Sequence, residues 1–110
     1  MKKLIYIACP YTQGDVAVNV HKAIVAANEI AYMGAIPYVP IWTHFWHLIT
    51  PKPWEFWIKL DSYFVGISDA LLRLPGESRG ADREVGQADI LGIPVFYQYD
   101  DLRKWLEIGE

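Results

Sequence analysis

The segment from Ser78 to Ala88 contains the residues best suited to chemistry in this chain. It reads Ser-Arg-Gly-Ala-Asp-Arg-Glu-Val-Gly-Gln-Ala, a glycine-containing loop that leads directly into a helical pattern. This transition predicts that Glu84 lies in the first turn of a helix, where unpaired backbone N–H groups would keep it ionised and receive a phosphate or oxyanion. Glu84 is therefore a candidate nucleophile beside an anion site. Acidic residues are also common in first turns simply because they complement the helix dipole.

Two residues near Glu84 fit a ligand site. Gly80 and Ala88 lie four residues away on either side and share the helix face of Glu84, where small side chains let a ligand approach. The hydroxyl of Ser78, together with the N–H groups of Gly80 and Ala81, can form a cradle for an anion. A serine before a helix is more often a cap or a turn residue, so Ser78 has this structural interpretation as well.

Tyr6 and Asp61 are candidates from distant parts of the sequence. Tyr6 falls in an apolar run that predicts a first strand, and a buried tyrosine hydroxyl needs a partner such as Glu84. Asp61 falls on a predicted helix, where a solvent-facing carboxylate is an equal alternative to a functional one. Asp69, eight residues later, has the character of a structural turn residue.

The histidines and the aromatic cluster carry weaker signals. His21, His44 and His47 form no pattern that marks a base or a metal ligand. The aromatic residues between Trp42 and Trp57 favour a core or oligomer surface over a wall that stacks on a ligand.

The elements that must position these residues alternate along the chain. Apolar runs predict four strands, and helical spacing predicts four helices with Gly34 and Gly92 as caps. The strands are expected at 4–8, 36–39, 70–74 and 93–97, the helices at about 16–33, 54–66, 80–91 and 100–106, and a loop at 40–53. This alternation predicts an α/β fold: a doubly wound, Rossmann-like or flavodoxin-like parallel sheet of four to five strands flanked by helices.

The order of the strands predicts where a site would lie. Doubly wound sheets bind ligands beyond the carboxyl ends of their strands, where the strand order reverses. If Pro37 places the second strand at an edge and the order is second, first, third, fourth, this reversal lies between the first and third strands. The loops at 9–15 and 75–80 would then face each other and bring the end of the first strand next to Glu84.

Length, composition and charge limit the possible functions. The chain has 110 residues, which predicts a single domain over 1–110. Its hydrophobic fraction is 53% and its aromatic fraction 15%, more apolar surface than so small a core can hide, so we expect a homodimer or a higher homo-oligomer. The net charge of −3, without clustered Lys and Arg, argues against a polynucleotide partner but allows a small anionic ligand.

The cysteine count and the hydropathy pattern predict a cytoplasmic protein. Cys9 is the single cysteine, so no intramolecular disulfide is possible, and no Cys and His pairs stand at the spacing of a structural zinc site. No apolar run approaches the roughly 18 residues of a membrane span. We therefore expect neither a bound metal nor a membrane partner.

Three motifs together resemble the nucleoside 2-deoxyribosyltransferase superfamily. They are Tyr6-Ile7-Ala8-Cys9-Pro10-Tyr11 at the first strand, Asp61 with Asp69 eight residues later, and Ser78-x-Gly80-x-x-x-Glu84. The nearest branch is that of the 2'-deoxynucleoside 5'-phosphate N-hydrolases. The resemblance covers nearly the whole chain in the order of its elements.

The resemblance implies an enzyme that cleaves the N-glycosidic bond of a (deoxy)nucleoside 5'-monophosphate and releases the base, without a cofactor. Glu84 matches the nucleophile that forms a covalent intermediate with the sugar, Tyr6 the tyrosine that positions it, and Asp61 the aspartate that contacts or protonates the departing base. Ser78 matches a phosphate-contacting serine of the hydrolase branch, where the transferase branch tends to have aspartate. Gly80, Tyr11 and Thr12 are expected to bind the nucleotide or nucleoside.

The sequence also departs from that pattern. The loop at 9–15 lacks the glycine and the arginine with which the hydrolase branch grips phosphate, so Thr12 with a backbone nest, or Arg79, would take that role. The segment 98–101 offers no serine of the kind that a neighbouring subunit contributes in that branch. Base exchange by a deoxyribosyltransferase, a nucleotide-binding module without catalysis, and an assembly domain with an aromatic surface remain as alternatives.

Overall fold

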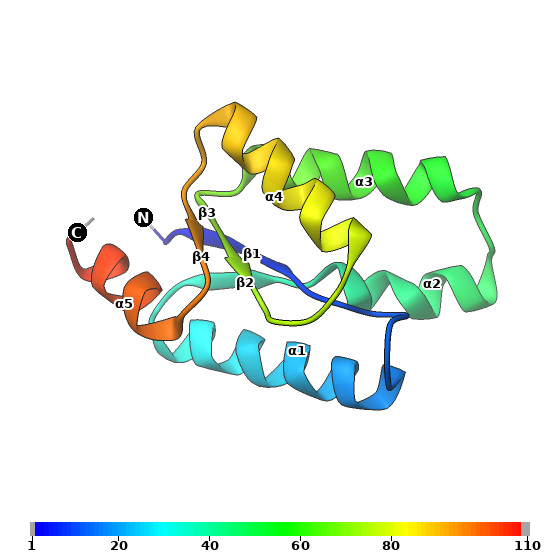
Figure 1. The fold of residues 1–110 in the computed structure, drawn as a ribbon, viewed down its shortest axis with the longest axis horizontal. Helices are drawn as coiled ribbons and strands as arrows, with labels where there is room; N and C mark the ends of the chain where they lie inside the picture. The colour runs from blue at the N-terminus through cyan, green and yellow to red at the C-terminus, as the bar shows by residue number, and fades with distance from the viewer. Residues whose placement is uncertain (1, 109–110) are drawn as a thin grey trace.

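The computed structural model describes residues 2–108 and is built around a four-stranded parallel sheet (Figure 1). The strand order is β2-β1-β3-β4, as predicted. The strands are β1 (Leu4–Ala8), β2 (Ile36–Tyr38), β3 (Ala70–Arg73) and β4 (Val95–Phe96). The predicted α/β class with a parallel sheet is therefore confirmed, with four strands.

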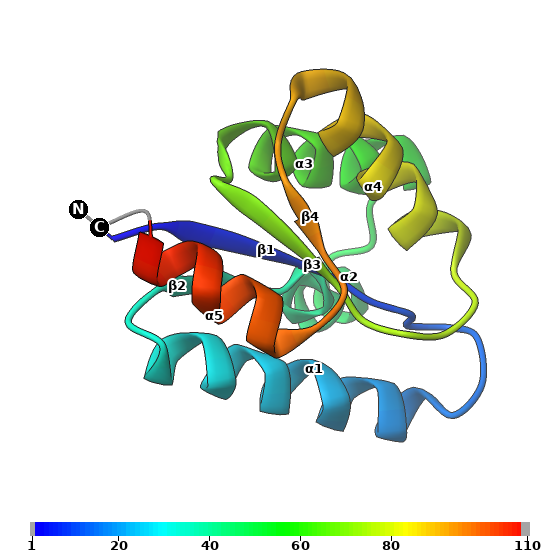
Figure 2. The same cartoon turned by 60° about the vertical axis from the view of Figure 1, so that its left-hand side comes forward.

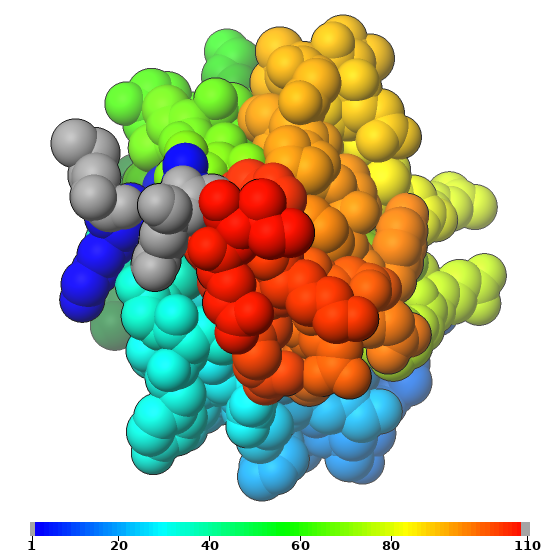
Figure 3. All heavy atoms as spheres, turned by 90° about the vertical axis from the view of Figure 1, so that its left-hand side faces the viewer, coloured from blue at the N-terminus to red at the C-terminus, as the bar shows by residue number. Residues whose placement is uncertain are grey.

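Within the described residues, five α-helices surround the sheet. They are α1 (Val16–Tyr32), α2 (His44–Ile49), α3 (Trp54–Ile67), α4 (Arg79–Leu91) and α5 (Tyr99–Ile108). Helices α1 and α5 cover one face of the sheet and α3 and α4 the other, which is the doubly wound arrangement (Figures 1 and 2). In the space-filling view, α5 lies against the β4 segment and above α1 (Figure 3). No helix within residues 2–108 is long and apolar enough to cross a membrane.

The central strand β1 is buried on both faces, as its uninterrupted apolar sequence predicts. Because side chains alternate along a strand, Ile5 and Ile7 join the core cluster beneath α1 and α5. Tyr6 and Ala8 join the cluster on the opposite face, with residues of α3 and α4. This alternation directs the Tyr6 side chain toward the face that carries Glu84.

The segment 40–53 differs from the prediction, which assigned it to a loop. It forms a 3₁₀ turn, η1 (Pro40–Thr43), followed directly by the short helix α2. Neither has a side-chain cap, and α2 is six residues long, so local signals for a helix are weak. Tertiary packing stabilises α2 instead, because its Trp46 contacts Phe56 and Trp57 of α3 edge to face.

Two boundaries after α4 also differ. The fourth strand has two residues rather than five, because the Ile93 N–H bonds to the Ala88 carbonyl and Pro94 has no N–H. Helix α5 begins at Tyr99, so Asp100 and Asp101 lie within its first turn and neither is the predicted cap.

The loops after β1 and β3 meet, as the strand order predicts. The Leu74 N–H donates to the Ala8 carbonyl at 2.9 Å, which extends the pairing of these two strands. Gly76, with a φ of +119°, lies so close to Pro10 that an added Cβ would be 2.8 Å from the proline Cγ. Only glycine fits this contact without displacement, so the two loops form one edge of the site.

Candidate functional site

A cavity of about 700 Å³ opens beyond the carboxyl ends of β1 and β3. Its walls come from the loop after β1, from η1 and α2, from α3, and from the first two turns of α4. Its volume is in the range of small-molecule sites in proteins. Six of the seven candidate residues line it: Tyr11, Thr12, Asp61, Ser78, Gly80 and Glu84.

The seventh candidate, Tyr6, lies behind the cavity and holds Glu84. Tyr6 is fully buried, and its hydroxyl donates a hydrogen bond to Oε2 of Glu84, as expected from the sequence. Burial, and then the charge of Glu84, raise the pKa of Tyr6 far above its usual range. The tyrosine therefore keeps its proton and fixes one oxygen of the carboxyl group.

Glu84 itself is less acidic than the sequence predicted. Burial raises the pKa of Glu84 to about 7, although the Tyr6 hydrogen bond and the charges of Arg83 and Arg73 oppose this shift. Helix α4 begins at Arg79, so Glu84 lies in its second turn, and the first-turn acid is Asp82. The prediction that Glu84 lies in the first turn is wrong, so the helix N-terminus contributes little to its ionisation, because that effect fades within the first turn.

Asp61, on α3, lines the same cavity as Glu84 and is also less acidic than an ordinary carboxyl group. Its Oδ1 atom is enclosed and has no hydrogen-bond partner among the described residues. Burial raises the pKa of Asp61 to about 6, against the opposing charge of Arg83. Asp61 is therefore not a solvent-facing helix carboxylate, which was the alternative interpretation. Its raised pKa means that slightly below neutral pH both its protonated and its ionised forms are populated.

Helices α3 and α4 are tied together beside these two acids. The Gln87 amide nitrogen on α4 donates to the Ser62 carbonyl on α3 at 2.9 Å. The Arg83 guanidinium lies over the Trp54 ring, 5.2 Å from its centroid, a distance typical of a cation–π contact. These contacts fix the spacing of the two cavity walls that carry Asp61 and Glu84.

Ser78 is the N-cap of α4, which confirms its structural interpretation. Its buried Oγ accepts the Ala81 N–H at 3.1 Å. Because the oxygen acts as acceptor in this bond, the hydroxyl proton remains available to a ligand. Arg79, exposed at the first position of α4, also lines the cavity.

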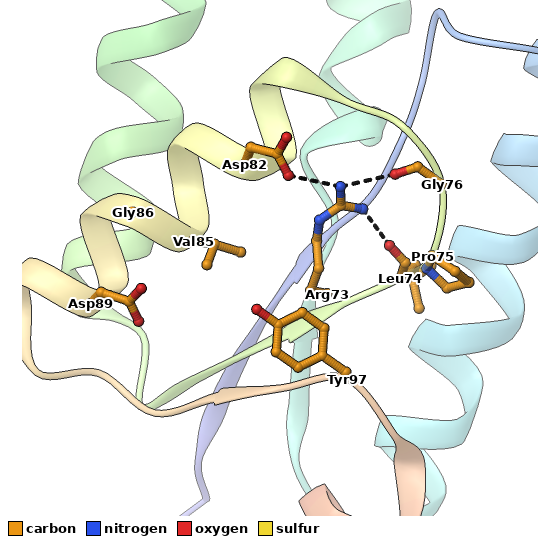
Figure 4. A pocket seen from close by; sticks show the side chains of 9 residues that line it. All are labelled: Arg73, Leu74, Pro75, Gly76, Asp82, Val85, Gly86, Asp89 and Tyr97. Atoms are coloured by element: carbon orange, nitrogen blue, oxygen red, sulfur yellow. Dashed lines mark hydrogen bonds and ion pairs between the residues drawn. The ribbon is translucent and has the colours of Figure 1, made fainter.

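Arg73 forms hydrogen bonds with the β3–α4 loop and with the first turn of α4, as Figure 4 shows. Its guanidinium donates to the Leu74 carbonyl, to the Gly76 carbonyl at 2.9 Å and to the Asp82 carboxylate at 3.0 Å. These bonds join the end of β3 to the first turn of α4 through the loop that carries Ser78. A shallower cavity of about 500 Å³ lies on this side of the loop, with Tyr97 across from Arg73.

Asp69 has the structural role expected of it. Its Oδ2 atom accepts the Leu4 N–H at 2.7 Å, at the amino end of the sheet and away from the cavity.

Sequence reasoning missed several residues of the cavity wall. His47 and Arg83 line it, and so do Trp54 and Trp57, which had been interpreted as core or oligomer surface. The spacing of Trp54, Trp57 and Asp61, three and then four residues apart, places them on one helix face and was a usable signal. His47 lies on α2, which the sequence did not predict.

One solved structure with a similar fold is a 2-deoxyribosyltransferase from the psychrotolerant bacterium Bacillus psychrosaccharolyticus, described as a biocatalyst for nucleoside synthesis. The two superpose with a TM-score of 0.68 over 91% of this chain and 90% of the other, at 18% sequence identity. At this identity the likeness establishes a shared fold. No protein-family model matches the sequence, and none of the curated proteins does.

Proposed function

We propose that this protein cleaves the N-glycosidic bond of a (deoxy)nucleoside 5'-monophosphate and releases the nucleobase. The observation that carries the proposal is the Glu84 carboxyl group at the cavity wall, held by the hydroxyl of the fully buried Tyr6. A second acid, Asp61, lines the same cavity. The fold shared with a nucleoside-processing enzyme supports the same substrate class.

In the first step, an oxygen of ionised Glu84 attacks C1' of the sugar. The C1'–N bond breaks, its electron pair goes to the base, and a proton from Asp61 neutralises the departing nitrogen or its conjugated oxygen. The carboxylate stabilises the oxocarbenium character of the transition state and divides one difficult displacement into two easier ones. Protonation of the base by a positioned acid contributes about 10²- to 10⁴-fold.

In the second step, water attacks C1' of the glutamyl–sugar ester. The ester bond to Glu84 breaks and regenerates the carboxylate, while Asp61, now ionised, accepts the proton of the water. The products are the free base and the sugar phosphate, and both acids return to their starting states. Tyr6 positions Glu84 through both steps, because its proton stays on the phenol.

In this proposal, the phosphate group of the substrate binds at the start of α4. Ser78 accepts the N–H groups of Ala81 and Asp82, so the expected cradle loses the Ala81 N–H. The Ser78 hydroxyl proton, the Gly80 N–H and the exposed guanidinium of Arg79 remain at this end of the cavity. Thr12, from the facing loop, completes this end.

The proposal is tested by incubating the protein with a panel of nucleoside monophosphates and nucleosides and separating any free base by chromatography. We expect base release from at least one deoxynucleoside monophosphate, and its loss by at least about 10³-fold in Glu84→Gln, because the amide cannot form the ester intermediate. Glu107→Gln, an exposed change on α5, is the matched control and should leave the rate unchanged. Full activity of Glu84→Gln would remove the proposed nucleophile.

Base exchange is the second candidate, because one structural neighbour is a 2-deoxyribosyltransferase. In that reaction a second base, rather than water, attacks the glutamyl–sugar ester. Adding a labelled free base separates the two: label recovered in a new nucleoside or nucleotide would favour transfer. A ligand-dependent rise in melting temperature without any base release would instead favour a non-catalytic binding module.

A further inference from the structure

His47 is held by α3 in a defined orientation. Its Nδ1 atom accepts the indole N–H of Trp57 at 2.8 Å and the backbone N–H of Lys52 at 3.3 Å. The ring also packs edge to face against Trp57, with centroids 5.5 Å apart. Because Nδ1 accepts both of these N–H groups, the hydrogen-bond pattern assigns the ring proton to Nε2.

The opposite edge of this ring remains free. Nε2 makes no hydrogen bond to any group within residues 2–108, and His47 is half-buried in the cavity wall. The structure therefore supplies a donor of fixed tautomer, which cannot become an acceptor without losing its bond to Trp57. Such a donor distinguishes ligand atoms that accept a hydrogen bond from those that donate one.

The neighbouring wall suits a flat heterocycle. Trp54, Trp57 and Ile58 lie along the cavity side of α3, followed by Asp61 one turn later. Asp61, when protonated, is a second donor on this wall. An oxopurine presents two adjacent acceptors, a ring nitrogen and a carbonyl oxygen, whereas an aminopurine presents an acceptor and an amino donor at the same places.

We propose that His47 is the specificity-determining residue of this site and selects bases with a carbonyl oxygen over their amino counterparts. The Nε2–H group of His47 donates to the carbonyl oxygen, while Asp61 contacts the adjacent ring nitrogen. An amino group in that position leaves two donors facing each other without an acceptor, which costs the hydrogen bonds that each group makes with water in the free state. This inference rests on the proposed function for its ligand class.

Binding to a variant that does not turn over tests the inference. In a Glu84→Gln background, calorimetry with deoxyinosine and deoxyadenosine monophosphates compares two ligands whose bases differ in the group at C6 and in the hydrogen on the neighbouring N1. We expect deoxyinosine monophosphate to bind about tenfold or more tightly. Adding His47→Asn should remove this preference, because Oδ1 still accepts the Trp57 N–H but no Nε2–H remains. Affinity for 2-deoxyribose 5-phosphate, which has no base, should not change.

A spectroscopic measurement tests the role of His47 without the His47→Asn variant, so the test does not depend on whether that variant folds. Imidazole nitrogen NMR of the Glu84→Gln protein should show His47 protonated at Nε2, and deoxyinosine monophosphate should move this signal while deoxyadenosine monophosphate does not. Equal binding of the two nucleotides, or the same preference after His47→Asn, would overturn the role of His47. Failure of the wild-type protein to release base would instead overturn the proposed reaction, because neither binding nor NMR depends on turnover.

Discussion

The chemistry proposed for Glu84 depends on a competition between two effects on one side chain. A helix N-terminus favours the ionised form, but Glu84 lies in the second turn of α4, where this effect is weak. Burial favours the protonated form and raises the pKa of Glu84 to about 7. Near neutral pH a substantial fraction of Glu84 is therefore ionised, and its partial burial leaves this carboxylate less solvated than in water.

The two acids give the reaction a defined pH dependence. Burial raises the pKa of Glu84 to about 7 and that of Asp61 to about 6, so the form with Glu84 ionised and Asp61 protonated is a minority species that is most populated between these two pH values. We predict a bell-shaped profile of kcat/KM between these two values, since only the form with Glu84 ionised and Asp61 protonated is active. Steady-state rates of base release measured from acidic to alkaline pH check the profile.

Asp61→Asn provides the control for the assignment of the two limbs. The asparagine cannot lose a proton in this range, so the decline at alkaline pH should disappear while the rise at acidic pH remains. An alkaline decline that persists in Asp61→Asn would show that another group limits the rate.

At the residue scale, the sequence predicted contacts that follow from residue type. It did not predict features that depend on the neighbours a residue acquires on folding. The Tyr6–Glu84 hydrogen bond was foreseeable, because a buried phenol and a nearby carboxylate are natural partners. The enclosure of Asp61 and the tautomer of His47 were not, because each depends on neighbours that only folding brings together.

At the scale of elements, the start of α4 combines a structural and a ligand-binding task. Ser78 caps the helix, so replacement by alanine would remove both the cap and the proposed phosphate contact. Aspartate separates the two tasks, since it is an equally good N-cap but carries a negative charge. We predict that Ser78→Asp retains the melting temperature while activity on nucleoside monophosphates falls by about tenfold or more, from repulsion of phosphate.

The same variant on unphosphorylated substrates completes that experiment. Activity of Ser78→Asp on free nucleosides should be equal to or greater than that of the wild-type protein. An equal loss on both substrate types, with the melting temperature unchanged, would show that Ser78 does not contact phosphate.

The contact between the loops after β1 and β3 makes a separate prediction. Gly76 and Gly92 both have positive φ, which costs alanine about 1–2 kcal/mol, but only Gly76 also faces Pro10. Gly76→Ala should therefore lower the free energy of unfolding by about 1–3 kcal/mol more than Gly92→Ala does. Urea unfolding of the two variants measures this difference, and equal losses would contradict the tight packing of the two loops.

The helices and strands were predictable where the burial of their side chains follows a regular pattern along the sequence. Strands β1 and β3 are apolar runs buried on both faces, and α1 and α4 have clear helical spacing with residues suited to their ends. Helix α2 escaped prediction because it is short and uncapped and depends on packing against α3. Because α2 was not predicted, His47, which lies on it, was not recognised as a site residue.

At the scale of the whole molecule, the surface is larger than that of a typical monomer of this mass and carries large exposed apolar side chains. The accessible area is 6931 Å², against roughly 6,200 Å² for a typical monomer of the same mass. Large apolar side chains are exposed along α2 and the 3₁₀ turn before it, with Phe45 exposed by 70% and Ile49 by 84%. This distribution supports the expectation that the protein self-associates.

We predict that sedimentation at micromolar concentration gives a mass of at least twice that of the 12.6 kDa chain. Ile49→Glu should shift the protein toward the monomer, because a buried unpaired carboxylate opposes association. Tyr32→Glu, on an exposed position of α1, is the control and should not change the mass. A monomer at all concentrations would contradict a role for this surface in self-association.

The central claim, that Glu84 becomes covalently bound to C1' of the sugar, is tested most directly by trapping the ester. A 2'-fluorinated deoxynucleoside monophosphate slows the second step, because fluorine withdraws electrons from the oxocarbenium-like transition state. Mass spectrometry of the peptides should then show one fluorinated sugar phosphate attached to Glu84 and to no other residue. Release of the base from this analogue without any adduct, or an adduct on a different side chain, would contradict the account.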